Sequence, residues 1–215
     1  MNADSTKITV CGRLESGLEL SHNTPSEAIY KGVLLVPRTS GTVDRVPVHI
    51  PGRLYTDAMN ASDGIMAVSG VLRTYCTKAG NGSYTRVTML ASEVSKGGSD
   101  TPVNLVNITG TITREPVFRS TPLGREICDI MLAVNRGHGH IDYIPCIAWG
   151  GNARTASASY HVGGRLHVVG RFQSREYTKL LESGEAVTCT TYEISISKMK
   201  LCPVEKPDAE PVQEE

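Results

Sequence analysis

The only tryptophan of the chain lies in the segment DYIPCIAWG, residues 142–150. If this segment is a strand, its side chains alternate between two faces, and Tyr143 and Trp149 share one face with Pro145 and Ile147. The opposite face would carry Ile144, Cys146 and Ala148. Both faces hold apolar groups, but only one holds large flat rings. The segment is therefore either a strand buried on both sides or a strand that presents two rings outward.

No pattern in the chain indicates catalysis or metal binding. The six histidines show no motif that ties one of them to a nucleophile, and the six cysteines form no CxxC pair. The two histidines of GHGH (137–140) lie on a Gly-rich hairpin at a spacing that argues poorly for a metal site. GNGS (80–83) lacks the Lys-Ser/Thr and the strand-then-helix context of a phosphate loop. We therefore predict a protein that is not an enzyme and needs no cofactor or metal.

The composition favours a soluble chain with a packed core. Hydrophobic residues make up 40% of the 215 residues, but no apolar run is long enough for a membrane span. The first ten residues, MNADSTKITV, lack the basic and apolar blocks of a signal peptide. We expect a cytoplasmic protein without disulfides, with its cysteines packed as small hydrophobic residues.

Charge is distributed unevenly along the chain. Residues 1–100 hold ten basic and nine acidic side chains, and residues 101–202 hold eleven and eight. The last thirteen residues, PVEKPDAEPVQEE, hold one basic and five acidic side chains and are too poor in apolar groups to fold. A mildly basic body with a disordered acidic tail is compatible with a polyanionic partner.

The sequence repeats itself with an almost constant offset. ITVCGRLES resembles VNITGTITR, GVLLVPR resembles DIMLAVNR, DRVP resembles DYIP, and MAVSGVL resembles LHVVGRF. The landmark pairs are Gly12 and Gly110, Arg38 and Arg136, Gly70 and Gly170, and Glu93 and Glu193, with offsets of 98 to 100. We therefore predict two copies of one domain, over residues 1–96 and 103–202, joined by a linker at 97–102.

Each copy is expected to contain mostly strands. In the second copy, strands are predicted over 103–114, 125–136, 141–149, 165–175 and 186–200, with loops at 118–124 and 176–184. The one helix is expected over 151–162, capped by Asn152, with Ala153, Ala156 and Tyr160 facing inward. Three strands, a short helix and two further strands are typical of a five-stranded OB-fold barrel. The predicted fold is all-β with short helices, built as two tandem OB-fold barrels and a disordered acidic C-terminal tail.

The second copy resembles the bacterial single-stranded DNA-binding protein (SSB) family. The resemblance lies in VNITGTITREPVFRSTPLGREICDIMLAVNR, DYIPCIAWGGNA and GGRLHVVGRFQSREY, in their order and in their Gly and Pro positions. Such proteins stack bases on aromatic rings in a basic groove, which tolerates any sequence. The resemblance implies stacking by Tyr143, Trp149 and Tyr177 and phosphate contacts by Arg136, Arg114 and Arg175. Phe172, on the other side of its strand, is expected in the core.

The chain departs from the pattern of that family in three places. Arg136 and His138 stand where many members have another aromatic residue, and the tail ends in PVQEE rather than in an acidic-hydrophobic tip. In the first copy, Arg45 replaces Tyr143 and Pro51 replaces Trp149, while Thr77, with Tyr75 nearby, stands at the position of Tyr177. We therefore expect the first copy to be a degenerate OB fold with a structural or pairing role.

The resemblance implies a non-catalytic protein that coats single-stranded DNA in replication, recombination or repair. A homodimer would bring four OB folds together, with replication or repair proteins as further partners, on a bacterial chromosome, phage or plasmid. The alternative is an OB-fold interaction module or primosome-type accessory protein that binds DNA weakly. The bare first copy and the altered tail favour the alternative, whereas the set of three rings favours DNA binding.

Overall fold

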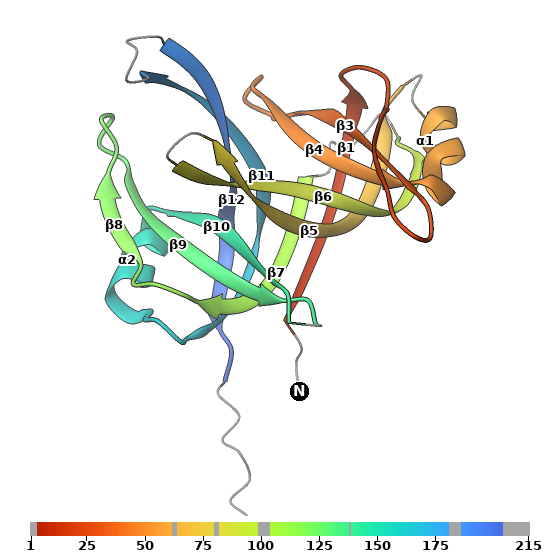
Figure 1. The fold of residues 1–215 in the computed structure, drawn as a ribbon. Coiled ribbons are helices and arrows are strands. Elements are labelled where there is room, and N and C mark those ends of the chain that lie inside the picture. The colour runs from red at the N-terminus through yellow and green to blue at the C-terminus, as the bar shows by residue number, and fades with distance from the viewer. Residues whose placement is uncertain are drawn as a thin grey trace, which may run out of the picture.

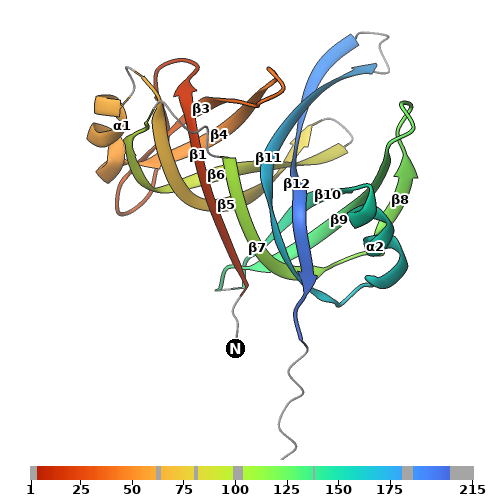
Figure 2. The same ribbon diagram turned by 180° about the vertical axis from the view of Figure 1, so that it is seen from behind.

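The structure, a computed structural model, describes residues 4–61, 64–79, 82–98, 104–137, 139–180 and 186–203, with the side chains of 76–79, 82–84, 179 and 180 left out. The first half contains β1 (Ser5–Leu14), β2 (Glu19–Asn23), β3 (Ala28–Pro37), β4 (Val43–Pro51), η1 (Gly52–Leu54), α1 (Tyr55–Ala61), β5 (Met66–Ala79) and β6 (Gly82–Lys96). The second half contains β7 (Asn104–Ile112), β8 (Val117–Ser120), β9 (Glu126–Asn135), β10 (Ile141–Trp149), α2 (Gly151–Ser159), β11 (Arg165–Leu180) and β12 (Ala186–Leu201). The two halves lie side by side (Figures 1 and 2).

Each half closes a five-stranded barrel. In the first half, β1 pairs with β3 and β5, and the parallel pairing of β4 with β6 completes the ring. The second half repeats this pattern with β7, β9, β10, β12 and β11. The short strands β2 and β8 pair only at the outer edges of β3 and β9. The prediction of two tandem OB-fold barrels is confirmed.

A continuous sheet joins the two barrels. β1 pairs antiparallel with β7 over six residue pairs, from Ser5 opposite Thr109 to Val10 opposite Asn104. Alternate residues of both strands, such as Ile8 and Ile108, are fully buried in a core that extends through both halves. Backbone hydrogen bonds and apolar burial therefore hold the barrels together along their first strands.

The glycines that mark the repeat are required by close backbone contacts. β1 leaves β5 at Gly12 and turns toward β3, and a Cβ on Gly12 would lie 2.6 Å from the carbonyl oxygen of Leu35. A Cβ on Gly110 would lie 2.6 Å from the carbonyl oxygen of Ala133. The equal distances explain why glycine occurs at the same place in both copies, since any side chain would push the closing strand away.

The last strands of the two halves do not follow the predicted offset. Arg73 pairs with Thr88 in the first half, and its counterpart Gln173 pairs with Glu193 in the second. The structural counterpart of Glu193 is therefore Thr88, and the landmark pair of Glu93 and Glu193 was wrong. The reason is the length of the hairpin: Arg73 and Thr88 are 15 positions apart, whereas Gln173 and Glu193 are 20 apart, a difference of five.

Several local predictions also need correction. β8 occupies the first part of the predicted loop at 118–124, and β11 continues to Leu180, so that Tyr177 lies within a strand. α2 ends at Ser159, and its N-cap is Gly150 rather than Asn152, whose side-chain amide donates to the carbonyl oxygen of Ser197 at 3.2 Å. The predicted inner face of Ala153, Ala156 and Tyr160 is buried, as is Phe172. Residues 99–102 of the linker predicted at 97–102, and residues 204–215 of the tail predicted at 203–215, lie outside the described residues.

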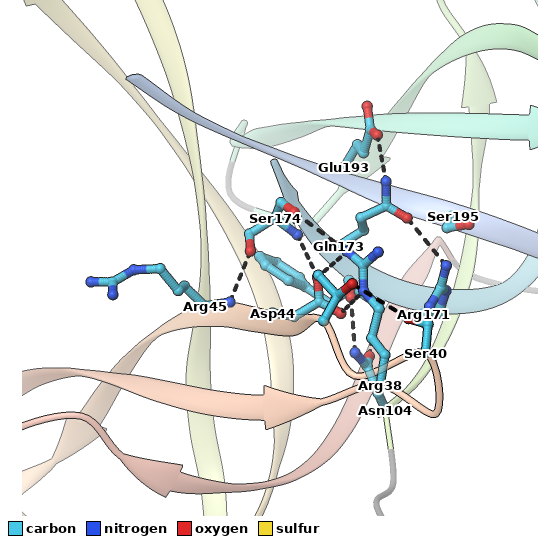
Figure 3. Close-up of polar contacts among 12 residues, drawn as sticks. Arg38, Ser40, Asp44, Arg45, Asn104, Arg171, Gln173, Ser174, Glu193 and Ser195 are labelled. Carbon is cyan, nitrogen blue, oxygen red and sulfur yellow. Dashed lines mark hydrogen bonds and ion pairs between the residues drawn. The ribbon is translucent and has the colours of Figure 1, made fainter. Parts of the chain in front are cut away.

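The β5–β6 hairpin of the first barrel and the β11–β12 hairpin of the second each contact a buried aspartate of the opposite barrel. Asp44, at the start of β4, is fully buried and accepts the backbone N–H of Ser174 at 2.8 Å, while the N–H of Arg45 donates to the Ser174 hydroxyl (Figure 3). Arg38 donates to the same carboxylate, and this hydrogen bond raises the pKa of its guanidinium. Asp44 thus joins the β3–β4 hairpin of the first barrel to β11 of the second.

The second barrel makes the reciprocal contact. Asp142, at the start of β10 and also fully buried, accepts the N–H and hydroxyl of Thr74 at 2.7 and 3.1 Å. The N–H of Tyr143 donates to the Thr74 hydroxyl, as that of Arg45 does to Ser174. Arg73 and Arg136 flank this carboxylate. We call these two sets of contacts, centred on Asp44 and Asp142, the paired clasp.

Replacing Asp142 by Ala should lower the free energy of unfolding by about 3–5 kcal/mol, because two arginines and a strand N–H would lose a buried partner. Thermal or denaturant unfolding measures the change. The matched control is Asp129→Ala, which breaks the more exposed pair with Arg119 and should cost about 1 kcal/mol or less. Equal losses in the two variants would contradict a structural role for the clasp.

Candidate nucleic-acid interface

The outer face of the second barrel carries the predicted rings. Along β10, the described burial alternates: Ile144, Cys146 and Ala148 are buried in the core, whereas Tyr143 is 46% exposed. Trp149 is partly exposed on the same side. The prediction that these residues alternate between an inner and an outer face of the strand is confirmed. Ile147, between the two rings, is nevertheless only 4% exposed.

Trp149 is fixed by a hydrogen bond across the face. Its indole Nε1–H donates to the hydroxyl of Ser195 on β12 at 3.1 Å, which satisfies the one polar group of the ring. Ser195 lies opposite Ile147 on β10 and opposite Arg171 on β11. The tryptophan therefore has a set orientation while its ring remains partly accessible.

β11 supplies the third ring and one of the three predicted arginines. Gln173, Arg175 and Tyr177 alternate with the buried Phe172 and share the outer side of the strand, and Tyr177 is 43% exposed. Burial raises the pKa of the Glu193 carboxyl, and Arg175, which is exposed, lies close enough to oppose part of that rise. The structure thus brings Tyr143, Trp149, Arg175 and Tyr177 to one face.

The other two predicted arginines have different surroundings. Arg136 follows β9 and lies 3.7 Å from Asp142, so it belongs to the paired clasp as well as to the edge of this face. Arg114 lies exposed in the connection between β7 and β8. Within the described part of the chain, no hydrogen bond or ion pair joins Arg114 to the strands that carry the rings.

Sequence reasoning missed several further charged residues of this face, among them Glu193, Asp129, Arg119 and Arg38. Glu193 accepts a hydrogen bond from Gln173 at 3.1 Å, and Asp129 pairs with Arg119 at 2.7 Å. Burial raises the pKa of Glu193, and Asp129 adds to this shift while Arg175, Arg119 and Arg38 oppose it. Arg38 comes from the first barrel, so only the fold places it near this face (Figure 3). The strand alternation was the signal that could have placed Asp129 and Glu193 here.

The matching face of the first barrel has a different surface. Arg45, at the position of Tyr143, is ion-paired with Glu15, and Pro51 ends β4 where Trp149 ends β10. The side chain of Thr77 lies outside the described residues. His49 and Tyr75 face outward here, and their rings meet edge to face at 5.9 Å.

The described residues show no group of three or more His, Cys, Asp or Glu side chains that could hold a metal ion. Among the same residues, no helix is long and apolar enough to cross a membrane.

Comparisons with known proteins agree with this geometry. The model of the Single-strand binding protein family matches residues 103–202. Single-stranded DNA-binding protein 2 of Listeria innocua is 35% identical over 81 residues, which cover 35% of this chain and 51% of the relative. Single-stranded DNA-binding protein of Enterococcus faecalis is 34% identical over 94 residues, which cover 41% and 49%. The chain spans about half the length of these curated relatives.

A solved structure resembles both barrels together. Wild-type single-stranded DNA binding protein from Thermus aquaticus superposes with a TM-score of 0.72 and 19% identity, over 99% of this chain and 100% of that chain. The deletion mutant of the same protein gives a TM-score of 0.71 and 21% identity. At this identity, the likeness establishes the shared tandem fold.

Replacing Glu193 by Gln should stabilise the protein at pH 8 but not at pH 4. A carboxyl whose pKa is raised in the folded state costs stability once the pH rises through that pKa, and below the unfolded pKa it is protonated in both states. Glutamine keeps the acceptor for Gln173 without the charge. We expect the melting temperature to rise by roughly 1–4 °C at pH 8.

Thermal melts at the two pH values measure this difference. The control is Glu176→Gln, which removes an exposed carboxylate from β11 and should have little effect at either pH. A Glu193→Gln protein that melts lower than wild type at pH 8 would mean that the ionised carboxylate stabilises the fold.

Proposed function

Because residues 103–202 match the model of the Single-strand binding protein family, we propose that this chain binds single-stranded DNA without sequence preference and without catalysis. The observation that carries the proposal is the set of three rings, Tyr143, Trp149 and Tyr177, on one outer face. Every base has a π-face, so such rings bind any sequence. The protein would act in replication, recombination or repair, in the bacterial cytoplasm, on chromosomal or mobile-element DNA.

The arginines of this face supply the second half of the interaction. Arg175 is exposed beside Tyr177 on β11, and Arg136 and Arg114 lie at the edges of the second barrel. Each arginine that meets a phosphate releases counterions, so binding should weaken as salt increases. Asp129 and Glu193 repel phosphates at the same face and so limit the affinity.

The main binding surface is assigned to the second barrel, residues 103–202, and a supporting role to the first, residues 1–96. The pairing of Arg45 with Glu15 supports this division, because it occupies the position of Tyr143 with an ion pair. The alternative remains an interaction module or primosome-type accessory protein with weak DNA binding. It would be favoured if Trp149 proved to be only a structural residue.

The single tryptophan allows a direct test. Its emission should be quenched when oligo-dT is added, and Trp149→Ala should weaken binding by about 1–3 kcal/mol because one stacked ring is lost. Trp149→Phe should lose less, since a ring remains, although its hydrogen bond to Ser195 is removed. Fluorescence titration of the wild type and filter or gel-shift binding of the variants provide the measurements.

Salt and stability separate binding from folding in this experiment. The salt dependence of Trp149→Ala should match that of wild type, because the slope counts phosphate contacts and not rings. A Trp149→Ala protein that is much less stable, yet binds oligo-dT with wild-type affinity once the folded fraction is taken into account, would refute the role in stacking.

We also propose a homodimer, which would bring four OB folds together. The outward side of the sheet around β1 and β7 offers a surface for pairing, where Leu105 is 45% exposed in the middle of the continuous sheet. Light scattering should give twice the chain mass of 23.1 kDa. A species of 23.1 kDa that persists at all concentrations would exclude the dimer.

A further inference from the structure

β11 continues well beyond its pairing with β7. In the described part of the chain, β11 pairs with β7 from Arg165 to Gly170 and with β12 from Leu166 to Leu180. A two-stranded ribbon is only marginally stable by itself. The part of β11 that follows Gly170 carries Tyr177, so the position of this ring depends on what fixes the root of the ribbon.

Side chains continue the hydrogen bonding of this edge where the ladder with β7 ends. Asn104, the first residue of β7, accepts the N–H of Phe172 with its side-chain oxygen at 2.8 Å. Its side-chain N–H donates to the carbonyl oxygen of Phe172, also at 2.8 Å. One side chain thus satisfies both backbone groups of a strand residue, as a neighbouring strand would. The second barrel itself therefore fixes the ribbon as far as Phe172.

The first barrel supplies the next pair of contacts, at Ser174. The Asp44 carboxylate accepts the Ser174 N–H at 2.8 Å, and Arg38 donates to the Ser174 carbonyl oxygen at 3.4 Å (Figure 3). Arg38 Nε also donates to Asp44 at 2.7 Å, so the acceptor and the donor are bound to each other. The ion pair therefore does for Ser174 what the Asn104 side chain does for Phe172.

Burial gives this ion pair a fixed position. The side chain of Asp44 is fully buried, and that of Arg38 is mostly buried. The hydrogen bond to Asp44 raises the pKa of the Arg38 guanidinium against the effect of burial, and the charge of Glu193 raises it further. Separating the two groups would leave an unpaired charge in the interior, which is costly. The β3–β4 hairpin thus presents a fixed acceptor and a fixed donor to β11.

The residues that meet DNA in the proposed function follow Ser174 closely. Arg175 is the next residue, and Tyr177 lies three positions further on, which is roughly 10 Å along an extended strand. Gln173, on the other side of Ser174, donates to Glu193 on the ring-bearing face at 3.1 Å. A ribbon released at Ser174 would turn about its root and carry the Tyr177 ring away from the two rings of β10.

We propose that Asp44 and Arg38 of the first barrel are positioning residues for single-strand binding by the second barrel, a role that rests on the proposed function. They hold β11 at Ser174, so that Tyr177 lies in line with the rings of β10. Trp149 does not depend on this contact, because its hydrogen bond to Ser195 lies within the second barrel. The supporting role of the first barrel thus has a specific form, which is a pair of hydrogen bonds to the backbone of its neighbour.

A double-mutant cycle on the full chain tests this role, with affinities corrected for the folded fraction. Asp44→Ala should weaken binding of oligo-dT by up to the roughly 5- to 100-fold that loss of the Tyr177 stack causes. In a Tyr177→Ala background, Asp44→Ala should weaken binding less than about twofold further, because the ring that it positions is already absent. In a Trp149→Ala background, the full effect of Asp44→Ala should remain.

Because Asp44→Ala leaves a buried arginine unpaired, a second variant replaces both charges. Arg38→Met combined with Asp44→Val removes the contacts to Ser174 and fills their space with an apolar pair, which keeps most of the stability. This variant should give the same cycle. Hydrogen exchange of the free protein provides a readout that needs no DNA: amides of β11 beyond Ser174 should exchange faster in the variant, and those of β9 should be unchanged.

Three results would overturn the proposal. The variants could weaken binding equally in the Tyr177→Ala and Trp149→Ala backgrounds, they could bind oligo-dT as wild type does, or the exchange of β11 beyond Ser174 could be unchanged. A wild-type protein that does not bind oligo-dT would instead refute the proposed function, so the two failures are distinguishable.

Discussion

The arrangement of the two barrels depends on two buried carboxylates that accept hydrogen bonds from the backbone of the opposite half. A charge taken out of water is costly unless its hydrogen-bonding capacity is satisfied. Asp44 and Asp142 meet this condition only when Ser174 and Thr74 lie against them. The continuous sheet at β1 and β7 fixes one edge of the boundary, and the paired clasp fixes the hairpins at the other. The ring-bearing face depends on these contacts too, because Tyr143 follows Asp142 directly in the chain and its N–H donates to the Thr74 hydroxyl.

Much of the fold was predictable because backbone constraints recur at fixed places. Gly12 and Gly110 stand where a side chain would collide with the closing strand, and the repeat could be read from such positions. The alternation of side chains along β10 was enough to predict that Tyr143 and Trp149 lie on the same face of that strand. The register of β12 was not predictable, since a longer hairpin shifts every pairing after its tip and leaves the alternation of residue types unchanged.

The paired clasp was not predictable for a different reason. Its partners in opposite barrels are separated by 68 to 130 positions, and an aspartate at the start of a strand looks like a surface residue in the sequence. Contacts of this kind exist only after both barrels have formed and docked, so local patterns carry no information about them.

The pairing of β1 with β7 has a consequence for how such a protein can change. When a barrel pairs with an identical copy of itself, each substitution appears on both sides of the axis, and a residue that suits one barrel must be tolerated in the other. Here β1 and β7 belong to one polypeptide, so their pairing does not require the two barrels to have identical residues. Threonine in one half and serine in the other make the same contact with an aspartate. Each half can therefore carry its own residues and surface, while the architecture of a symmetric pair is retained.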